Sequence, residues 1–211
     1  MTRKLSISAG FVAAAVGLAF VAIPGGASAT EGRSRGHVHA HLTELNNSGV
    51  SGIATVDVRG RRLNASIFAT GLLPNAPHAV HIHFGETALH ECPTQAADGG
   101  NGKLTTSEGL PFYGPVVVAF TLFGDTSAAS TLAVDRFDTT PSGVLDYHRD
   151  RIKTQRSVAK AVARGEGVVV IHGVDYNGNG FYDFEAAGAS DLDPTLAAEA
   201  TDLAACGVLN D

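Results

Sequence analysis

The sequence lacks the short motifs that mark the commonest enzyme classes. It has no G-x-S-x-G nucleophile elbow, no Walker phosphate loop and no glycine-rich dinucleotide fingerprint. It also has no clear internal repeat and no Pro/Ser linker. Hydrolase and nucleotide-binding hypotheses are therefore unsupported, and one domain is favoured over several.

Long apolar runs are missing after the first residues. Residues 1–4 are basic, residues 5–23 are small and apolar, and Ala27-Ser28-Ala29 has the small-x-small pattern of a signal-peptidase site. We interpret 1–29 as a secretory signal, with a transmembrane anchor as the alternative. No later run approaches membrane-spanning length. We expect a flexible lead over 30–36 and a single secreted domain over 37–211, free of the membrane once the signal is removed.

Cysteine is scarce, with only Cys92 and Cys206. Both follow the signal, and export implies an oxidising compartment, so an even pair predicts one disulfide. The alternative is two thiolate metal ligands, which the isolated positions of the cysteines disfavour.

Positive charge is in deficit. Lys and Arg number 15 against 21 Asp and Glu, giving a formal net charge of −6. Loss of Arg3 and Lys4 with the signal makes the remaining chain more acidic. An acidic exported domain argues against nucleic acid or anionic lipid as a partner and is compatible with binding cations.

The chain is rich in alternating apolar and polar positions, which is typical of β-strands. Val38, Ala40 and Leu42 alternate with histidines, and residues 53–58 and 63–69 predict a hairpin. Further strands are expected over 116–123, 131–137, 168–172 and 205–209, and a short helix over 150–163. The pattern predicts an all-β fold, a Greek-key β-sandwich or flattened barrel with one short helix and long loops.

Histidines gather at positions that suit a metal site. His81 and His83 alternate with Val80 and Ile82, so both imidazoles point to one face of a strand. His172 ends another apolar strand and supplies a third nitrogen. Three imidazoles suit copper or zinc.

Other histidines are weaker candidates. His90 is a possible fourth ligand if the following loop folds back. An exposed strand face carries a possible accessory metal site, or an ordinary polar surface, formed by His37, His39 and His41.

A second type of metal site is suggested near the C-terminus. Oxygen-bearing side chains there follow the spacing of an EF-hand calcium loop, at Asp175, Asn177, Asn179 and Asp183. Ala186 stands where a bidentate Glu is expected. The alternative is an Asn/Gly-rich turn.

The order of these motifs resembles the framework of Cu,Zn superoxide dismutases. The matching segments are His81-Ile82-His83, Gly85, Cys92, Val169-Val170-Ile171-His172 and Ala205-Cys206-Gly207-Val208. The resemblance implies copper ligands at His81, His83 and His172, and a disulfide between Cys92 and Cys206.

The chain also departs from that family. Residues 93–147 contain no histidine, so the bridging histidine and the zinc ligands are unmatched and zinc is not expected at the family position. Leu203 stands where the family has an arginine that guides superoxide. An anionic substrate then loses its fixed positive charge.

A second resemblance covers the same span. Residues 108–115, 165–175 and 177–180 are similar to exported bacterial proteins of the CHRD (chordin-type) domain class. This likeness implies a β-domain without a defined reaction.

The sequence thus favours a binding module over an enzyme, and we assign no catalytic residue. The leading hypothesis is a secreted domain that binds copper without efficient dismutation. One alternative is a copper-only superoxide dismutase. The other is a structural or interaction module whose loops are stiffened by calcium.

Overall fold

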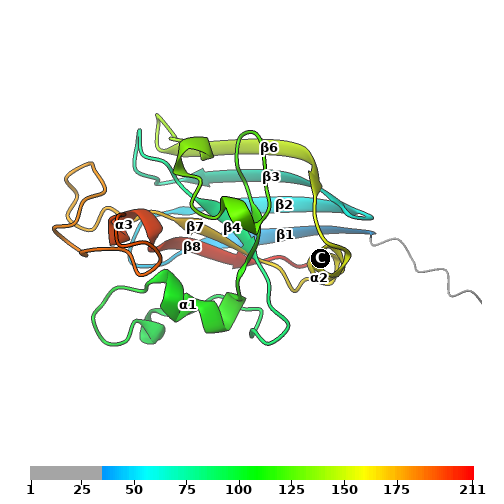
Figure 1. The fold of residues 1–211 in the computed structure, drawn as a ribbon, viewed down its shortest axis with the longest axis horizontal. Coiled ribbons are helices and arrows are strands. Elements are labelled where there is room, and N and C mark those ends of the chain that lie inside the picture. Colours follow the sequence, from blue (N-terminus) through cyan, green and yellow to red (C-terminus); the bar gives the residue numbers. More distant parts are fainter. Residues whose placement is uncertain (1–34) are drawn as a thin grey trace, which may run out of the picture. The chain divides into compact units, whose positions relative to one another are not determined.

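The computed structural model describes residues 35–211, and the expected signal at 1–29 and most of the lead lie outside them. The described chain forms one antiparallel sheet of eight strands in the order β5-β4-β7-β8-β1-β2-β3-β6 (Figure 1). The predicted all-β fold is therefore confirmed. No helix in the described part of the chain is long and apolar enough to cross a bilayer.

Short helices and loops connect the strands. The strands are β1 (Arg35–Glu44), β2 (Ser51–Arg59), β3 (Arg62–Thr70), β4 (Val80–His83), β5 (Val116–Ala119), β6 (Val144–Lys153), β7 (Val168–His172) and β8 (Leu203–Val208). The helices are α1 (Thr106–Tyr113), α2 (Arg156–Ala163) and α3 (Ala198–Thr201), with single 3-10 turns η1 (Gln95–Ala97), η2 (Ala128–Ser130) and η3 (Val134–Arg136). Residues 35–211 thus hold three short α-helices where the sequence predicted one.

The alternation in β1 to β3 has the predicted effect. Val38, Ala40 and Leu42 are buried, and the histidines between them are on the opposite face. β2 and β3 form the predicted hairpin, in register from Ser51↔Thr70 to Arg59↔Arg62. Side chains two residues apart share a face of the sheet, so the pattern alone fixes which face is buried.

The larger core lies on the inner face of the sheet. Buried aliphatic side chains from every strand form it, including Ile67, Ile82 and Ile171. Each such side chain stabilises the fold by about 1.5–3 kcal/mol through burial. The segment after β5 is tied to β6 at the other end of the strand order, because Tyr147 Oη and Arg149 Nη1 both donate hydrogen bonds to the Thr121 carbonyl oxygen at 3.2 and 2.6 Å.

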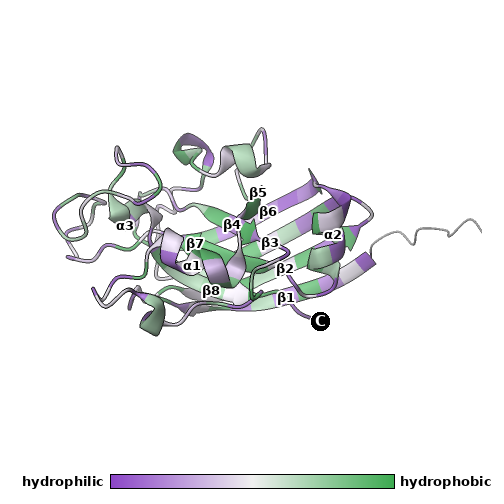
Figure 2. Cartoon of the chain, turned by 60° about the horizontal axis from the view of Figure 1, so that its bottom comes forward, coloured by the Kyte–Doolittle hydropathy of each residue, from purple (hydrophilic) through white to green (hydrophobic). Residues whose placement is uncertain are grey.

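A smaller core lies on the outer face of β7 and β8. There Leu104 and Tyr113 pack against Val168, Val170 and Leu203. Figure 2 shows α1 in front of β7 and β8, which contribute apolar side chains to this cluster. The outer face is therefore covered at the end of the sheet that carries β4 and β7.

Three local predictions were wrong. Residues 131–137 form no strand: they continue from η2 into η3, and Leu122 N donates to Arg136 O at 2.8 Å. Residues 150–153 belong to β6, where Ile152 pairs with Leu63, and the helix begins only at Arg156. The strand expected over 116–123 is shorter and ends at Ala119.

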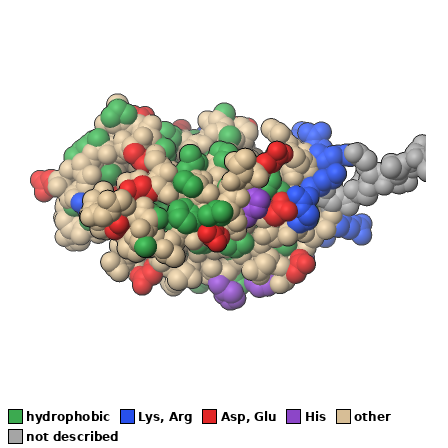
Figure 3. All heavy atoms as spheres, turned by 90° about the horizontal axis from the view of Figure 1, so that it is seen from below, with side chains coloured by type: hydrophobic (Ala, Val, Ile, Leu, Met, Phe, Trp, Pro, Cys, Tyr) green, Lys and Arg blue, Asp and Glu red, His purple; other side chains and the backbone are tan. Residues whose placement is uncertain are grey.

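Charge is unevenly distributed over the surface. Four basic residues lie in register across neighbouring strands, at Arg35, Arg59, Arg62 and Lys153. Figure 3 shows Lys and Arg side chains gathered at one end of the visible face, whereas Asp and Glu are spread over it. The net charge of −6 therefore does not describe every part of the surface.

Candidate metal centre

Two neighbouring strands place three histidines on the same face of the sheet. On β4, His81 and His83 lie opposite Val170 and Val168 of β7. His172 follows Val170 by two residues, so it shares that face, and its backbone N donates to Ala79 O at 2.9 Å. The three side chains are 1–3 % exposed. Alternation in both strands thus directs all three imidazoles to the outer face of the sheet, the face on which α1 packs.

The three rings converge. Their centroids are 5.7 Å apart for His81–His83, 5.1 Å for His81–His172 and 6.0 Å for His83–His172. One nitrogen of each lies within 4.8 Å of the others, and no other set of three or more His, Cys, Asp or Glu in residues 35–211 is so placed. Two nitrogens bound to one ion lie up to about 4 Å apart, so ring shifts below about 1 Å would close the site.

Backbone carbonyls fix the tautomer of each ring. His81 Nε2 lies 3.1 Å from Thr131 O, His83 Nδ1 lies 2.8 Å from Gly114 O, and His172 Nδ1 lies 2.7 Å from Thr201 O. A carbonyl oxygen only accepts, so these nitrogens carry the hydrogen.

The opposite nitrogens are His81 Nδ1, His83 Nε2 and His172 Nε2, which are buried without a hydrogen-bond partner. These are the nitrogens left available to bind a metal, because the other nitrogen of each ring is hydrogen-bonded to a carbonyl group.

The surroundings keep these histidines neutral. Burial lowers the pKa of His83 to about 3 and that of His172 to about 4 from an ordinary value of 6.5. Burial, followed by the charges of His172 and His83, holds the pKa of His81 well below its usual range. Metal ligation needs neutral imidazole, so the site does not have to release protons at neutral pH.

A small cavity of about 30 Å³ adjoins the three histidines. Its other lining residues are threonines and aliphatic side chains, and it contains no arginine or carboxylate. Tyr113 packs on His83 with ring centroids 4.3 Å apart, and Phe137 packs on His81 at 5.5 Å. Leu203 is buried and packs in one cluster with Leu104 and Tyr113. No positive side chain therefore faces the site from the cavity wall.

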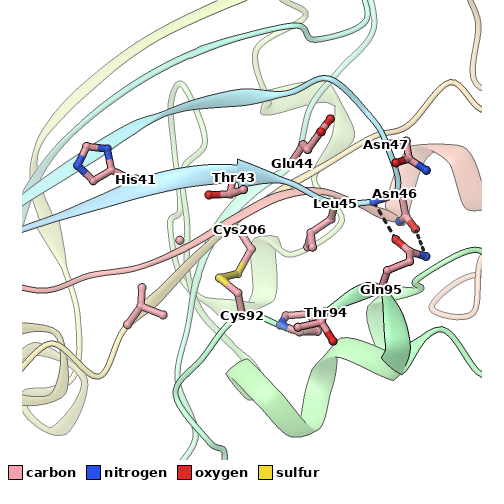
Figure 4. Close-up of a pocket in the computed structure, with 13 residues that line it drawn as sticks. His41, Thr43, Glu44, Leu45, Asn46, Asn47, Cys92, Thr94, Gln95 and Cys206 are labelled. Atoms are coloured by element: carbon pink, nitrogen blue, oxygen red, sulfur yellow. Dashed lines mark hydrogen bonds between the residues drawn. A yellow bond between two sulfur atoms is a disulfide. The ribbon is translucent and has the colours of Figure 1, made fainter.

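A disulfide attaches the segment between β4 and α1, which leads into the helix covering the site, to strand β8 of the sheet. Cys92 is bonded to Cys206 of β8, 114 residues away in the sequence, which confirms the predicted bond and excludes the thiolate alternative. Figure 4 shows this disulfide beside a cavity of about 510 Å³ on the surface.

Beyond the disulfide, Gln95 and Asn46 exchange hydrogen bonds at 3.2 and 3.3 Å. Asn46 Nδ2 also donates to Leu104 O at 2.9 Å and Leu203 O at 3.0 Å. The segment leading to α1 is thus held on the sheet by one covalent bond and a polar bridge.

His90 lies outside the histidine group. Its Nε2 is hydrogen-bonded to Gly85 O at 2.7 Å, and its ring stacks on Phe84 with centroids 5.2 Å apart. The loop folds His90 back onto the end of β4 rather than into the cavity.

The accessory candidates lie on the exposed face of β1. His37 Nδ1 is 3.0 Å from the Asp57 carboxylate, and the His39 and His41 rings are 5.8 Å apart. They do not converge as a set of three ligand atoms.

The candidate calcium loop is stabilised by its own hydrogen bonds. The Asp175 carboxylate accepts from the backbone N of Gly178, Asn179 and Gly180 at 2.9, 3.2 and 2.8 Å. Asp183 accepts from Glu185 N at 2.7 Å and also from the Asn179 side-chain amide. Asn177 accepts from Asn179 N at 3.1 Å. This is the geometry of an Asx-type turn, in which the side-chain oxygens already accept hydrogen bonds from backbone N–H groups.

Sequence reasoning missed the residues that orient the histidines. Thr131, Gly114 and Thr201 act through backbone carbonyls, which leave no mark on side-chain type. Helix α1 did carry a signal: Thr105 and Glu108 form a capping box, the pattern Thr-x-x-Glu that announces a helix start.

Comparison with models of known protein families gave no match, and comparison with curated proteins gave none. The interpretation of the site therefore depends on the residues of this chain.

Proposed function

We propose that this protein is a secreted domain of superoxide-dismutase-like, CHRD-type architecture that binds one copper ion through His81, His83 and His172 without efficient dismutation. The supporting observation is the set of three buried ring nitrogens without partners, each on an imidazole whose other nitrogen is held by a backbone carbonyl. Unpaired buried polar atoms cost about 1–3 kcal/mol each, so their convergence favours a ligand at this point.

The lack of catalytic support argues for binding rather than turnover. Superoxide is an anion, and fixed positive charge near the metal raises its local concentration. The cavity wall beside the histidines is aliphatic and threonine-lined and carries no such charge. The resemblance to the dismutases implies a positively charged arginine at position 203, and this chain has a buried leucine there.

The test combines metal analysis with a superoxide assay on purified protein. We expect one copper per chain in the wild type and almost none in His83→Ala. The matched control is His41→Ala, which removes an exposed histidine from β1 and should retain the copper. Circular dichroism would verify that each variant is folded.

The assay separates the alternatives. Copper retained with little superoxide consumption supports the binding module. Rapid consumption that disappears in His83→Ala would instead establish a copper-only dismutase. Absence of stoichiometric metal in the folded wild type would refute both and leave the structural module.

A further inference from the structure

The ligand set bears on the oxidation state of the bound copper, an inference that rests on the proposed copper site. All three donors are neutral imidazoles, and no carboxylate or thiolate lines the cavity. Asp191 is the acidic residue whose charge acts on His172, but its carboxylate is outside the cavity lining and accepts a hydrogen bond from Ser107 N at 2.8 Å. A metal here would keep its full charge.

Burial of that charge discriminates between ions. The three ligands are 1–3 % exposed, so the ion would sit in a low-dielectric environment. The cost of removing an ion from water rises steeply with its charge, and it is offset in proteins by anionic ligands. This site supplies none, so a monovalent ion is favoured over a divalent one.

Coordination number acts in the same direction. Zn(II) takes four ligands, and Cu(II) prefers a tetragonal arrangement, so each needs additional donors beyond the three nitrogens. A cavity of about 30 Å³ has room for about two water-sized ligands at most. Its wall gives such waters few partners. The hydroxyl groups of Thr106, Thr131 and Thr201 already donate hydrogen bonds to Thr201 O, Ala128 O and Ser190 Oγ, and the other lining residues besides the histidines are aliphatic. Cu(I), a filled-shell ion, is stable with a trigonal set of ligands.

We propose that the His81–His83–His172 centre is selective for monovalent copper and keeps it cuprous, because the small cavity and its largely aliphatic wall disfavour the additional ligands that Cu(II) and Zn(II) require. The function of the site is then capture of Cu(I) rather than redox cycling. This explains chemically why an otherwise dismutase-like ligand set would turn over poorly.

The test measures affinity for each ion separately. Under anaerobic conditions, purified protein would compete with bathocuproine disulfonate for Cu(I), and with nitrilotriacetate for Cu(II) and Zn(II). We expect stoichiometric Cu(I) bound at least about 100-fold more tightly than Zn(II). After exposure to air, the copper should remain silent in electron paramagnetic resonance.

Two outcomes overturn the inference in different ways. Zn(II) bound as tightly as Cu(I), or a stoichiometric Cu(II) resonance signal, would refute cuprous selectivity while leaving the copper site intact. Failure to bind any of the three ions would refute the proposed function itself.

A variant tests the cause of the selectivity. Val134 lines the cavity and is 43 % exposed, so Val134→Glu places a carboxylate at the wall without burying it in the core. We expect this change to raise the affinity for Zn(II) relative to Cu(I) by about tenfold, because the added charge favours the divalent ion. The matched control is Val144→Glu, at a valine that is 36 % exposed and lies outside the cavity. Equal effects of the two substitutions would contradict the proposal.

Discussion

The Nδ1–H of His83 donates a hydrogen bond to the backbone carbonyl oxygen of Gly114, 2.8 Å away. Gly114 is the residue that ends α1, at φ 81° and ψ −176°, a conformation open almost only to glycine. The orientation of one candidate ligand is therefore set by the end of the helix that covers the site.

Substitution of Gly114 should weaken metal binding without touching a ligand. A Cβ there would lie 2.6 Å from Gly85 N and 2.8 Å from the Phe84 carbonyl carbon, so the backbone must move. Because the partners that orient metal ligands typically contribute 10- to 100-fold in affinity, we expect Gly114→Ala to lower copper affinity by roughly that factor. Competition titration would measure it.

The control for this substitution is Gly100→Ala. Gly100 also has a positive φ, of 88°, but a Cβ there meets nothing within 4 Å. It should lower stability through backbone strain and leave copper affinity unchanged. Similar affinity losses in both variants would show that strain, not the His83 contact, is responsible.

Stability of the metal-free protein should rise with pH from about 4 to 6.5. The folded-state pKa values of His83 and His172 are lowered to about 3 and about 4, whereas the unfolded chain has an ordinary value of 6.5. In that interval the unfolded state binds more protons, so acid favours unfolding. The stability contribution is complete above 6.5 and is lost as the pH falls through the folded-state values. Each histidine changes the unfolding free energy by about 1.4 kcal/mol per pH unit. Urea unfolding in chelator across this range measures the slope, and a flat profile contradicts the burial of neutral histidines.

Asp202 should act in the opposite direction. Burial raises its pKa to about 7, and its carboxylate accepts a hydrogen bond from Tyr176 Oη at 2.9 Å. Between its ordinary value of 3.8 and about 7, Asp202 is protonated in the folded state and ionised in the unfolded state. Its contribution therefore lowers the free energy of unfolding as the pH rises through this interval. Asp202→Asn keeps an acceptor for Tyr176 and removes the titration. The unfolding free energy of the variant should therefore climb with pH more steeply, by about 1.4 kcal/mol per unit. An unchanged slope would place the carboxylate in its charged form.

Removal of the disulfide should destabilise the domain and loosen the cover of the site. Cys92 and Cys206 close a loop with a sequence separation of 114, for which the chain-entropy model gives about 4–5 kcal/mol. The double variant Cys92→Ala/Cys206→Ala leaves no free thiol to confuse metal binding. Its urea midpoint should match that of the reduced wild type. If copper affinity is unchanged in the folded double variant, the disulfide contributes only to stability.

The alternation of apolar and polar residues was sufficient to predict most strands of the sheet, because a strand that is buried on one face has an apolar residue at every second position. It failed over 131–137, where Leu132 and Val134 are two residues apart, as in a strand, but the chain forms turns and the short helix η3. Their side chains instead line the cavity, at 37 % and 43 % exposure. The β6 strand was misread because its exposed positions near residue 150 are charged, and only the pairing of Ile152 with Leu63 reveals it.

The three histidines were predictable because each sits on a strand whose face is fixed by its neighbours. The tautomers of the three rings could not be predicted, because their partners are backbone carbonyl groups, which every residue has. These carbonyls belong to Thr131, Gly114 and Thr201. The position of His90 was also beyond the sequence, since it depends on a positive φ of 57° that turns the ring back onto Phe84.

The loop beginning at Asp175 offers a test that separates internal hydrogen bonding from calcium. The Asp175 carboxylate accepts three backbone N–H groups, so Asp175→Ala should cost about 1–3 kcal/mol even with chelator present. Asn177→Ala, which removes a single acceptor for Asn179 N, should cost less. Calcium binding to the folded state must raise the melting midpoint of the wild type. A midpoint that is the same with calcium and with chelator therefore removes calcium from the candidates, and the loop is then held by its hydrogen bonds to Asp175, Asn177 and Asp183.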